Sequence, residues 1–229
     1  MIAISGWQKS SFIDFPETVA TVLFLSGCNL RCPYCHNPGI VLGQYELLPF
    51  DNIRKHIIKR TGIIEGAVIS GGEPSIHHGL TELCAQLKAY GLKVKLDTNG
   101  LEPERLIVCN FDYIALDIKT SFKKYSLLNT PYYDNSERLG QAVDIVKNME
   151  ENGEVRITAA PGIIDRDDID SLCVELRGVN KVFIQQFDPT QQTLDPAYQS
   201  TKPYNTDELE VWRNMFTDAG IDCHIRGVA

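Results

Sequence analysis

Three closely spaced cysteines have the residue type and spacing to hold a metal centre. Cys28, Cys32 and Cys35 lie in the segment "GCNLRCPYCHNPG" at the spacing C-x3-C-x2-C. A structural zinc site takes four protein ligands, typically from paired C-x2-C units, and here no second pair follows. His36 adjoins Cys35, and neighbouring residues seldom reach the same ion from one loop. All-thiolate ligation suits zinc or an iron–sulfur cluster, and three thiolates leave one iron of a [4Fe–4S] cluster free for a small molecule. These residues favour the iron–sulfur cluster, with zinc as the alternative.

The elements that must position this site alternate between strands and helices. A β-branched and aromatic apolar run predicts a buried strand at 18–25. Further strands are expected at 66–70, 93–97, 112–118, 154–160 and 181–187, with another candidate at 222–226. Helical patterns lie at 51–60, 79–90, 103–109, 136–153, 167–178 and 205–220. This alternation predicts a parallel sheet with right-handed crossovers. Because a complete eight-unit barrel needs about 250 residues, a six-stranded open barrel or a doubly wound sheet fits better. We expect one domain over residues 1–229.

The remaining unusual residues fall at or near the C-terminal ends of these predicted strands. They are "SGGEP" (70–74), "DTNG" (97–100), Asp117, Lys119, Arg156, Gln185, Gln186 and Asp188. In parallel α/β sheets and barrels the C-terminal strand ends share one edge, where ligands bind. The two glycines of "SGGEP" also leave the main chain open to a ligand. We therefore expect one pocket, whose carboxylates and cations suit a ligand with both an ammonium group and a carboxylate.

Composition excludes several classes of function. Lys plus Arg number 22 and Asp plus Glu number 30, so the 229-residue chain has a net charge of −8 and a pI near 5.1. Such a chain is a poor candidate for binding nucleic acid or an anionic membrane. It has no run of roughly 20 apolar residues and no signal-peptide pattern, so we expect a cytoplasmic protein. Cys84, Cys109, Cys173 and Cys223 are expected to be small buried apolar side chains.

The cysteine motif, followed by a GGEP turn after the next predicted strand, resembles the radical S-adenosylmethionine (SAM) superfamily. The resemblance implies a partial (β/α)6 TIM-type barrel, with Cys28, Cys32 and Cys35 as ligands of a [4Fe–4S] cluster whose open iron binds SAM. It implies reductive cleavage of SAM to methionine and a 5′-deoxyadenosyl radical. No catalytic side chain is expected beyond the residues that bind the cluster and SAM.

Further segments narrow the resemblance to one branch. "CHNP", "DTNG" and "LDIK" resemble activating enzymes of glycyl-radical proteins, and the opening "GWQKSSFIDFPETVATVLFLSGCN" and "QQFDP" are most like the anaerobic ribonucleoside-triphosphate reductase activating proteins. By this resemblance the SAM-binding residues are Tyr34, Gly71, Gly72, Glu73, Asp97, Thr98, Asn99, Asp117, Lys119, Arg156 and Gln186. Tyr34 is expected near the adenine, the GGE residues at the methionine amino group, and Lys119 at the carboxylate, with a similar role for Arg156. Pyruvate formate-lyase activase has a histidine near the end of strand six, where this chain has Gln185 and Gln186. Many activases of other glycyl-radical enzymes carry a cysteine-rich, ferredoxin-like insert after the first motif. Residues 38–70 of this chain contain no cysteine, so only one cluster is expected.

The resemblance also implies partners. A glycyl-radical enzyme, most closely the large subunit of anaerobic ribonucleotide reductase, would lose a hydrogen from a glycine Cα, and a low-potential donor would supply the electron. The short chain favours this hypothesis because little of it remains to form a pocket for a large substrate. The alternatives are a radical SAM enzyme acting on a small molecule, related to the deazapurine synthases, and a non-enzymatic zinc-binding module.

Overall fold

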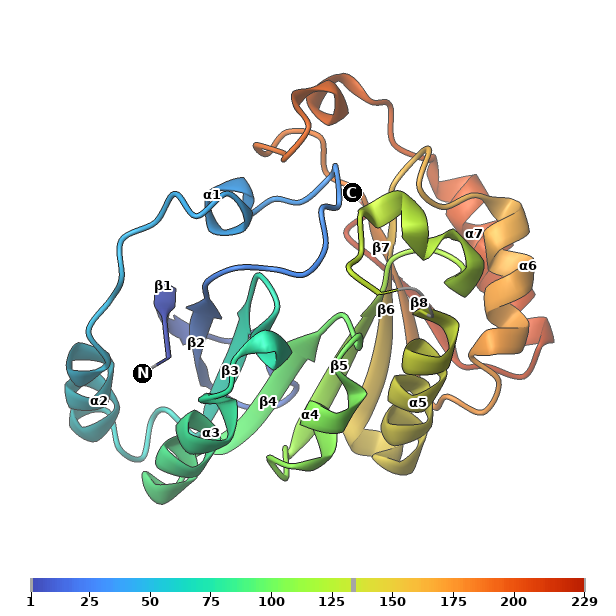
Figure 1. Ribbon diagram of the computed structural model, residues 1–229. Helices are drawn as coiled ribbons and strands as arrows, with labels where there is room; N and C mark the ends of the chain where they lie inside the picture. The colour runs from blue at the N-terminus through green and yellow to red at the C-terminus, as the bar shows by residue number, and fades with distance from the viewer. Residues whose placement is uncertain (1, 133–134, 229) are drawn as a thin grey trace. The chain divides into compact units, whose positions relative to one another are not determined.

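The structure, a computed structural model, describes residues 2–132 and 135–228 (Figure 1). The strands are β1 (Ile4–Ser11), β2 (Ala20–Leu25), β3 (Gly66–Gly71), β4 (Lys93–Thr98), β5 (Tyr113–Ile118), β6 (Gly153–Ala159), β7 (Val182–Gln186) and β8 (Cys223–Arg226). The α-helices are α1 (Pro38–Val41), α2 (Phe50–Lys59), α3 (Leu80–Ala89), α4 (Pro103–Ile107), α5 (Asn135–Asn148), α6 (Arg166–Glu175) and α7 (Thr206–Asp218). Short 3-10 helices are η1 (Pro74–Ile76), η2 (Phe122–Leu128), η3 (Glu150–Asn152) and η4 (Pro196–Ser200). The predicted strands and helices are all present, which confirms the α/β class.

The strand order distinguishes the two predicted architectures. The order in the sheet is the order along the chain, from β1 to β8. The pairs β2–β3, β3–β4, β6–β7 and β7–β8 are parallel, whereas β1 runs antiparallel to β2. A doubly wound sheet reverses its order at a switch point. The sequential order therefore supports the partial (β/α)6 barrel type, with β2 to β7 as its six predicted strands.

Strand β1 is an addition that the sequence did not predict. Gly6 lies in its interior, and Gln8 to Ser11 are polar, so the segment lacks the apolar alternation typical of a strand. Its pairing with β2 is irregular, with register shifts between Ile4 and Gly6 and between Gln8 and Ser11. Pairing with a buried neighbour therefore makes a strand of a segment with little strand character of its own.

The predicted helix at 136–153 was too long at its C-terminal end. Helix α5 ends at Asn148, and Glu150 has a φ of +50°, a left-handed conformation that does not continue an α-helix. Gly153 begins β6, and an added Cβ there would lie 2.5 Å from the Val146 carbonyl oxygen of α5. This glycine therefore permits close packing of the strand on the helix, and it is not the residue that ends the helix.

Two helix ends follow their sequence signals. Asn205 precedes α7 in a capping box: its Oδ1 accepts from the Glu208 N–H at 2.9 Å, and Glu208 Oε2 accepts from the Asn205 N–H at 2.8 Å. Gly91 follows α3 with a φ of +80°, and its N–H donates to the Lys88 carbonyl at 2.8 Å. No helix within the described ranges is long and apolar enough to cross a membrane.

The chain forms two compact units that interleave along the sequence. The first unit comprises Met1–Asn29, Gly39–Thr98 and Glu104–Ile114, and the second comprises Leu30–Pro38, Asn99–Pro103 and Ala115–Ala229. In the second unit, α7 packs against β8 and α6, and α5 packs against β6 (Figure 1). The expectation of a single domain over the whole chain stays a prediction.

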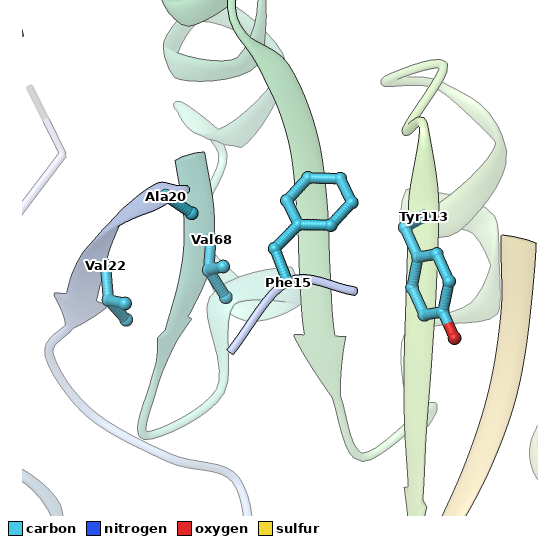
Figure 2. Packing of buried hydrophobic residues seen from close by; sticks show 5 residues of the cluster. All are labelled: Phe15, Ala20, Val22, Val68 and Tyr113. Carbon is cyan, nitrogen blue, oxygen red and sulfur yellow. The ribbon is translucent and has the colours of Figure 1, made fainter. Parts of the chain in front are cut away.

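The first unit contains an apolar cluster formed by residues of three strands and one connection. Figure 2 shows its members: Phe15 from the β1–β2 connection, Ala20 and Val22 on β2, Val68 on β3 and Tyr113 on β5. Val22 and Val68 are register partners, and the rings of Phe15 and Tyr113 lie 5.9 Å apart. These residues fix the positions of β2 and β3, whose C-terminal ends lead into the candidate site.

Candidate functional site

The glycine turn after β3 packs directly on the chain that leaves β2. The Gly72 N–H donates to the Leu25 carbonyl at 3.0 Å, and the Glu73 N–H donates to the Gly27 carbonyl at 2.9 Å. An added Cβ at Gly72 would lie 1.7 Å from the Gly27 oxygen and 3.2 Å from Cys28 Cβ. No side chain fits at position 72, because the turn is seated beside the first cysteine of the motif.

Position 71 also requires glycine, both for its backbone conformation and for lack of space. Its φ is +130°, and an added Cβ would lie 2.3 Å from both the backbone nitrogen and the oxygen of Leu25. Both glycines are therefore needed for close packing between β2 and β3, whether or not a ligand also approaches them. The predicted convergence of these two strand ends is confirmed within the first unit.

Glu73 joins the ends of β3 and β4. The residue is 1% exposed, and its Oε1 accepts from the Ser75 N–H at 3.0 Å, the Ser75 hydroxyl at 2.6 Å and the Thr98 hydroxyl at 2.7 Å. The Ser75 N–H bond caps η1, and the Thr98 bond reaches the last residue of β4. By the resemblance, Glu73 is expected to bind the amino group of SAM. The structure shows that this carboxylate also holds the turn in place.

The Asp97 carboxylate is held by a lysine that sequence analysis did not single out. Asp97 Oδ1 lies 2.8 Å from Lys95 Nζ, and both side chains are nearly buried. Residues two apart on a strand point to the same face. The available signal was therefore a lysine two positions before Asp97 within the same predicted strand.

Asn99, the third residue of "DTNG", belongs to the second unit and shapes the turn after β4. It is buried, and its Oδ1 accepts from the Leu101 N–H at 3.1 Å. Gly100 has a φ of +77°, and an added Cβ would lie 2.5 Å from Leu116 Cδ1 and 2.9 Å from Ala142 Cβ. Both residues have structural reasons for their identity, and the contact of Asn99 with SAM stays a prediction.

The second part of the cysteine segment packs against residues that follow β7. The Cys35 N–H donates to the Cys32 carbonyl at 3.0 Å, which places these two cysteines in one turn. The Asp195 N–H donates to the Pro33 carbonyl at 2.8 Å, and the Leu194 N–H donates to the Cys35 carbonyl at 3.0 Å. Backbone hydrogen bonds thus hold this turn within the second unit.

Several aromatic side chains lie at the turn that contains Cys32 and Cys35. Tyr34 is buried, and its ring centroid lies 6.3 Å from those of Phe187 and Tyr198. His36 stacks on Phe187 at 6.0 Å, and its Nε2 lies 3.0 Å from the Asp188 carbonyl oxygen. His36 therefore has a structural partner, and the expectation that it is not a ligand stays a prediction. The position of Tyr34 near an adenine stays a prediction.

Three charged residues meet in the second unit, as their strand positions predict. Arg156 Nε donates to Asp117 Oδ1 at 2.7 Å, and Lys119 Nζ lies 3.3 Å from Asp117 Oδ2. Burial alone would raise the pKa of Asp117, but the two cations outweigh burial and hold this pKa well below its usual range. Burial would lower the pKa of Lys119, but the Asp117 carboxylate raises it above its usual value. The convergence of the β5 end with Arg156 of β6 is confirmed.

Register separates the two glutamines at the end of β7. Gln185 is paired with Thr158, two residues after Arg156, so Gln185 shares the face of Arg156. Gln186 points to the opposite face, where its Nε2 donates to the Tyr204 carbonyl at 2.8 Å. Gln186 Oε1 is buried and has no hydrogen-bond partner among the described residues. The contact of Gln186 with SAM stays a prediction.

The four scattered cysteines are mostly structural. Cys84, Cys109 and Cys223 are buried, as expected, whereas Cys173 is half-buried. Cys84 Sγ donates to the Cys109 carbonyl oxygen at 3.1 Å.

Comparison with known proteins identifies the family. A profile of the radical SAM superfamily matches residues 22–173. A protein of Methanocaldococcus jannaschii, provisionally named a glycyl-radical enzyme activating enzyme, is 33% identical over 194 residues, 81% of this chain and 80% of the relative. The pyruvate formate-lyase-activating enzyme of Clostridium pasteurianum is 33% identical over 129 residues, 51% of this chain and 52% of that enzyme. The crystal structure of QueE from Escherichia coli matches with a TM-score of 0.56 at 18% identity, covering 99% of this chain and 94% of that one, and this shows the fold alone.

The chain therefore belongs to the radical SAM superfamily. It is a radical SAM enzyme, an oxidoreductase, and its similarity to activating enzymes agrees with the branch that its motifs indicate. Members of this superfamily use a [4Fe–4S] cluster and SAM.

The donor set of this chain fits these cofactors. Cys28 and Cys35 are partly exposed and Cys32 is buried, and three soft thiols on one short segment suit iron–sulfur ligation. Burial raises the pKa of the Cys32 thiol to about 11, although the Lys119 cation opposes this, and ligation would release the thiol proton. Within the described ranges no three Cys, His, Asp or Glu side chains are grouped as metal ligands, and Cys28 belongs to the first unit. The ligand assignment therefore rests on spacing and family.

Proposed function

We propose that this protein generates a glycyl radical on a partner enzyme, and that the partner is the large subunit of anaerobic ribonucleoside-triphosphate reductase. The similarity to a glycyl-radical activating relative over four fifths of both chains carries the first part of the proposal. The opening segment and the "QQFDP" segment, which resemble the reductase activating proteins, support the choice of partner. A cytoplasmic location belongs to the proposal, because reduced thiols need a reducing compartment.

In this proposal Cys28, Cys32 and Cys35 hold the cluster. When bound, the cluster and SAM supply an organic radical that removes a hydrogen atom from a glycine Cα. One electron from a low-potential donor and one SAM would thus yield methionine, 5′-deoxyadenosine and a glycyl radical on the partner. The contribution of this chain is to bind and orient SAM and to exclude water from the radical.

The charged group of the second unit supplies a site for the SAM carboxylate. Asp117, Lys119 and Arg156 together have two positive charges and one negative charge, which leaves a net positive charge for an anionic ligand. Arg156 is committed to Asp117 by a hydrogen bond of 2.7 Å, whereas Lys119 lies 3.3 Å from the same carboxylate. We therefore assign the carboxylate contact first to Lys119. Arg156, which the resemblance also places among the SAM-binding residues, adds its charge to the same site and orients Asp117.

The remaining SAM contacts follow the motif assignments. Gly71, Gly72 and Glu73 form the turn for the amino group, and Asp97 and Thr98 end the neighbouring strand of the same unit. Tyr34, Asn99 and Gln186 complete the proposed set. Support for the first group comes from its position beside Cys28, where the seating of Gly72 fixes the turn against the cysteine segment.

The experiment is anaerobic reconstitution followed by electron paramagnetic resonance. The reduced protein is incubated with SAM and the purified large subunit of anaerobic ribonucleotide reductase, and a glycyl-radical doublet is expected. Cys32→Ala and a reductase whose radical-site glycine is replaced by alanine are the controls, and neither is expected to give the signal. Pyruvate formate-lyase is tested in parallel.

Each outcome discriminates between hypotheses. A doublet on pyruvate formate-lyase but not on the reductase would keep the activase and change its partner. SAM cleavage without a radical on either protein, together with turnover of a small substrate, would overturn the activase hypothesis. Uptake of zinc alone, with no reducible cluster, would favour the non-enzymatic module.

A further inference from the structure

Lys95 is a buried lysine on the apolar side of the first unit. The residue is 2% exposed, and its register partner on β3 is Val68, a member of the cluster in Figure 2. Its ammonium lies 5.7 Å from the centroid of the Tyr113 ring. Burial of a lysine in apolar surroundings is costly unless its charge is paired. The partners of this ammonium therefore explain why the residue is tolerated there.

The ammonium has two close oxygen partners. Asp97 Oδ1 lies 2.8 Å away, and the Asp14 carbonyl oxygen accepts at 2.6 Å. The side chains of Lys95 and Asp97 are 3% and 12% exposed, so little water competes for either charge. An ion pair shielded from water holds its geometry more firmly than an exposed one.

We propose that Lys95 is a positioning residue that orients the Asp97 carboxylate for SAM binding. This inference rests on the proposed function, which assigns Asp97 a contact with SAM. Because Lys95 precedes Asp97 by two residues, the ion pair lies on one face of β4 and limits the directions in which the carboxylate can point. The next residue, Thr98, is fixed by its hydrogen bond to Glu73. Together the two contacts hold the C-terminal end of β4 by consecutive side chains.

The hydrogen bond to Asp14 suggests another role for Lys95, and the experiment must distinguish that role from the orientation of Asp97. Asp14 belongs to the β1–β2 connection, in which Phe12 and Ile13 are exposed while Phe15 is buried in the cluster. In the competing explanation, Lys95 serves only to tie this connection to β4. Loss of the Lys95 side chain would then weaken SAM binding by disturbing the fold, independently of Asp97.

A double-mutant cycle distinguishes the two roles. SAM affinity is measured by isothermal titration calorimetry on anaerobically reconstituted K95M, D97N and K95M/D97N proteins of matched iron content. We expect K95M to weaken SAM binding by roughly 10- to 100-fold, the range found when a residue that orients a metal ligand is lost. The double variant is expected to bind SAM as D97N does, because Lys95 acts through Asp97. The control is K88M, which removes another lysine of the first unit, paired with Asp112 at 3.1 Å, and should leave affinity unchanged.

The outcomes separate this inference from the proposed function. Absence of SAM binding by the wild type would overturn both. Equal affinity of the wild type and K95M would overturn the role of Lys95 alone, as would a double variant that binds at least about tenfold more weakly than D97N. Should K95M fail to fold, the comparison of SAM affinity between D97N and the double variant still shows whether Lys95 acts through Asp97. The double variant has no unpaired buried charge, and in D97N the introduced amide retains an oxygen for Lys95.

Discussion

Replacement of Gly72 by alanine tests whether the turn after β3 is set by packing. The added Cβ would lie 1.7 Å from the Gly27 oxygen and 2.5 Å from the Gly27 carbonyl carbon. Both are backbone atoms, so relief requires the turn to move away from the end of β2. Such a shift breaks the 2.9 Å bond from the Glu73 N–H to the Gly27 carbonyl and displaces Cys28.

The expected loss of stability combines two effects. Overpacking costs about 1–3 kcal/mol, and a buried hydrogen bond left unmade costs about 1–3 kcal/mol, so about 3 kcal/mol is a moderate total. The entropy of unfolding is about 2.1 cal/mol/K per residue, or about 0.5 kcal/mol/K for 229 residues. The variant should therefore unfold about 6 °C below the wild type. Thermal unfolding is measured on the protein without cluster or SAM, where a residue needed only for ligand binding has no effect.

The control for this experiment is Gly140→Ala. Gly140 lies in α5, and apart from its chain neighbours and the helix's own backbone no described atom lies within 4 Å of an added Cβ. Alanine is favoured over glycine in a helix by about 1 kcal/mol. We expect this variant to unfold at a slightly higher temperature than the wild type. If G72A and the wild type share a melting temperature while G140A shifts upward, the packing explanation for Gly72 is refuted.

Three further predictions follow from the site. Glu73→Ala removes the acceptor of three hydrogen bonds and should lower the melting temperature more than Glu73→Gln, which keeps an oxygen; the reverse order would contradict the network. The pKa of Asp117 is lower in the folded than in the unfolded protein, so its stabilisation is present at neutral pH and is progressively lost below about pH 4. The difference in melting temperature between the wild type and Asp117→Asn should therefore shrink from pH 7 to pH 3, and a constant difference would argue against it. Alanine at any of the three motif cysteines should abolish SAM cleavage, measured as 5′-deoxyadenosine, whereas Cys84→Ala should retain it; loss in Cys84→Ala would give that thiol a role beyond packing.

Elements with local signals were predictable from the sequence. Helix α7 begins where Asn205 and Glu208 form a capping box, because both partners lie within one turn of chain. Strand β1 was missed, because pairing with β2 is a long-range interaction that its polar residues do not announce. The end of α5 was missed because Gly153 resembles a helix terminator, whereas its actual constraint is a carbonyl of the preceding helix.

The candidate site likewise has features that the sequence predicts and features that only the fold reveals. The bonds from Thr98 to Glu73 and from Arg156 to Asp117 agree with the prediction that strand ends converge, since that prediction needs only parallel strands. The packing role of Gly72 was not predictable, because a glycine near a ligand and a glycine near another backbone look alike in sequence. Lys95 was missed because a strand lysine is ordinarily exposed, and only the fold shows its burial.

The buried pair of Lys95 and Asp97 also limits how this sequence can change over generations. Loss of one partner from a buried pair costs roughly 3–5 kcal/mol, while a domain is stable by only about 5–15 kcal/mol. A lineage that replaces either residue first must therefore pass through a form with much of its stability removed. We expect the two positions to differ together among relatives, so that a neutral residue at one is accompanied by a neutral residue at the other.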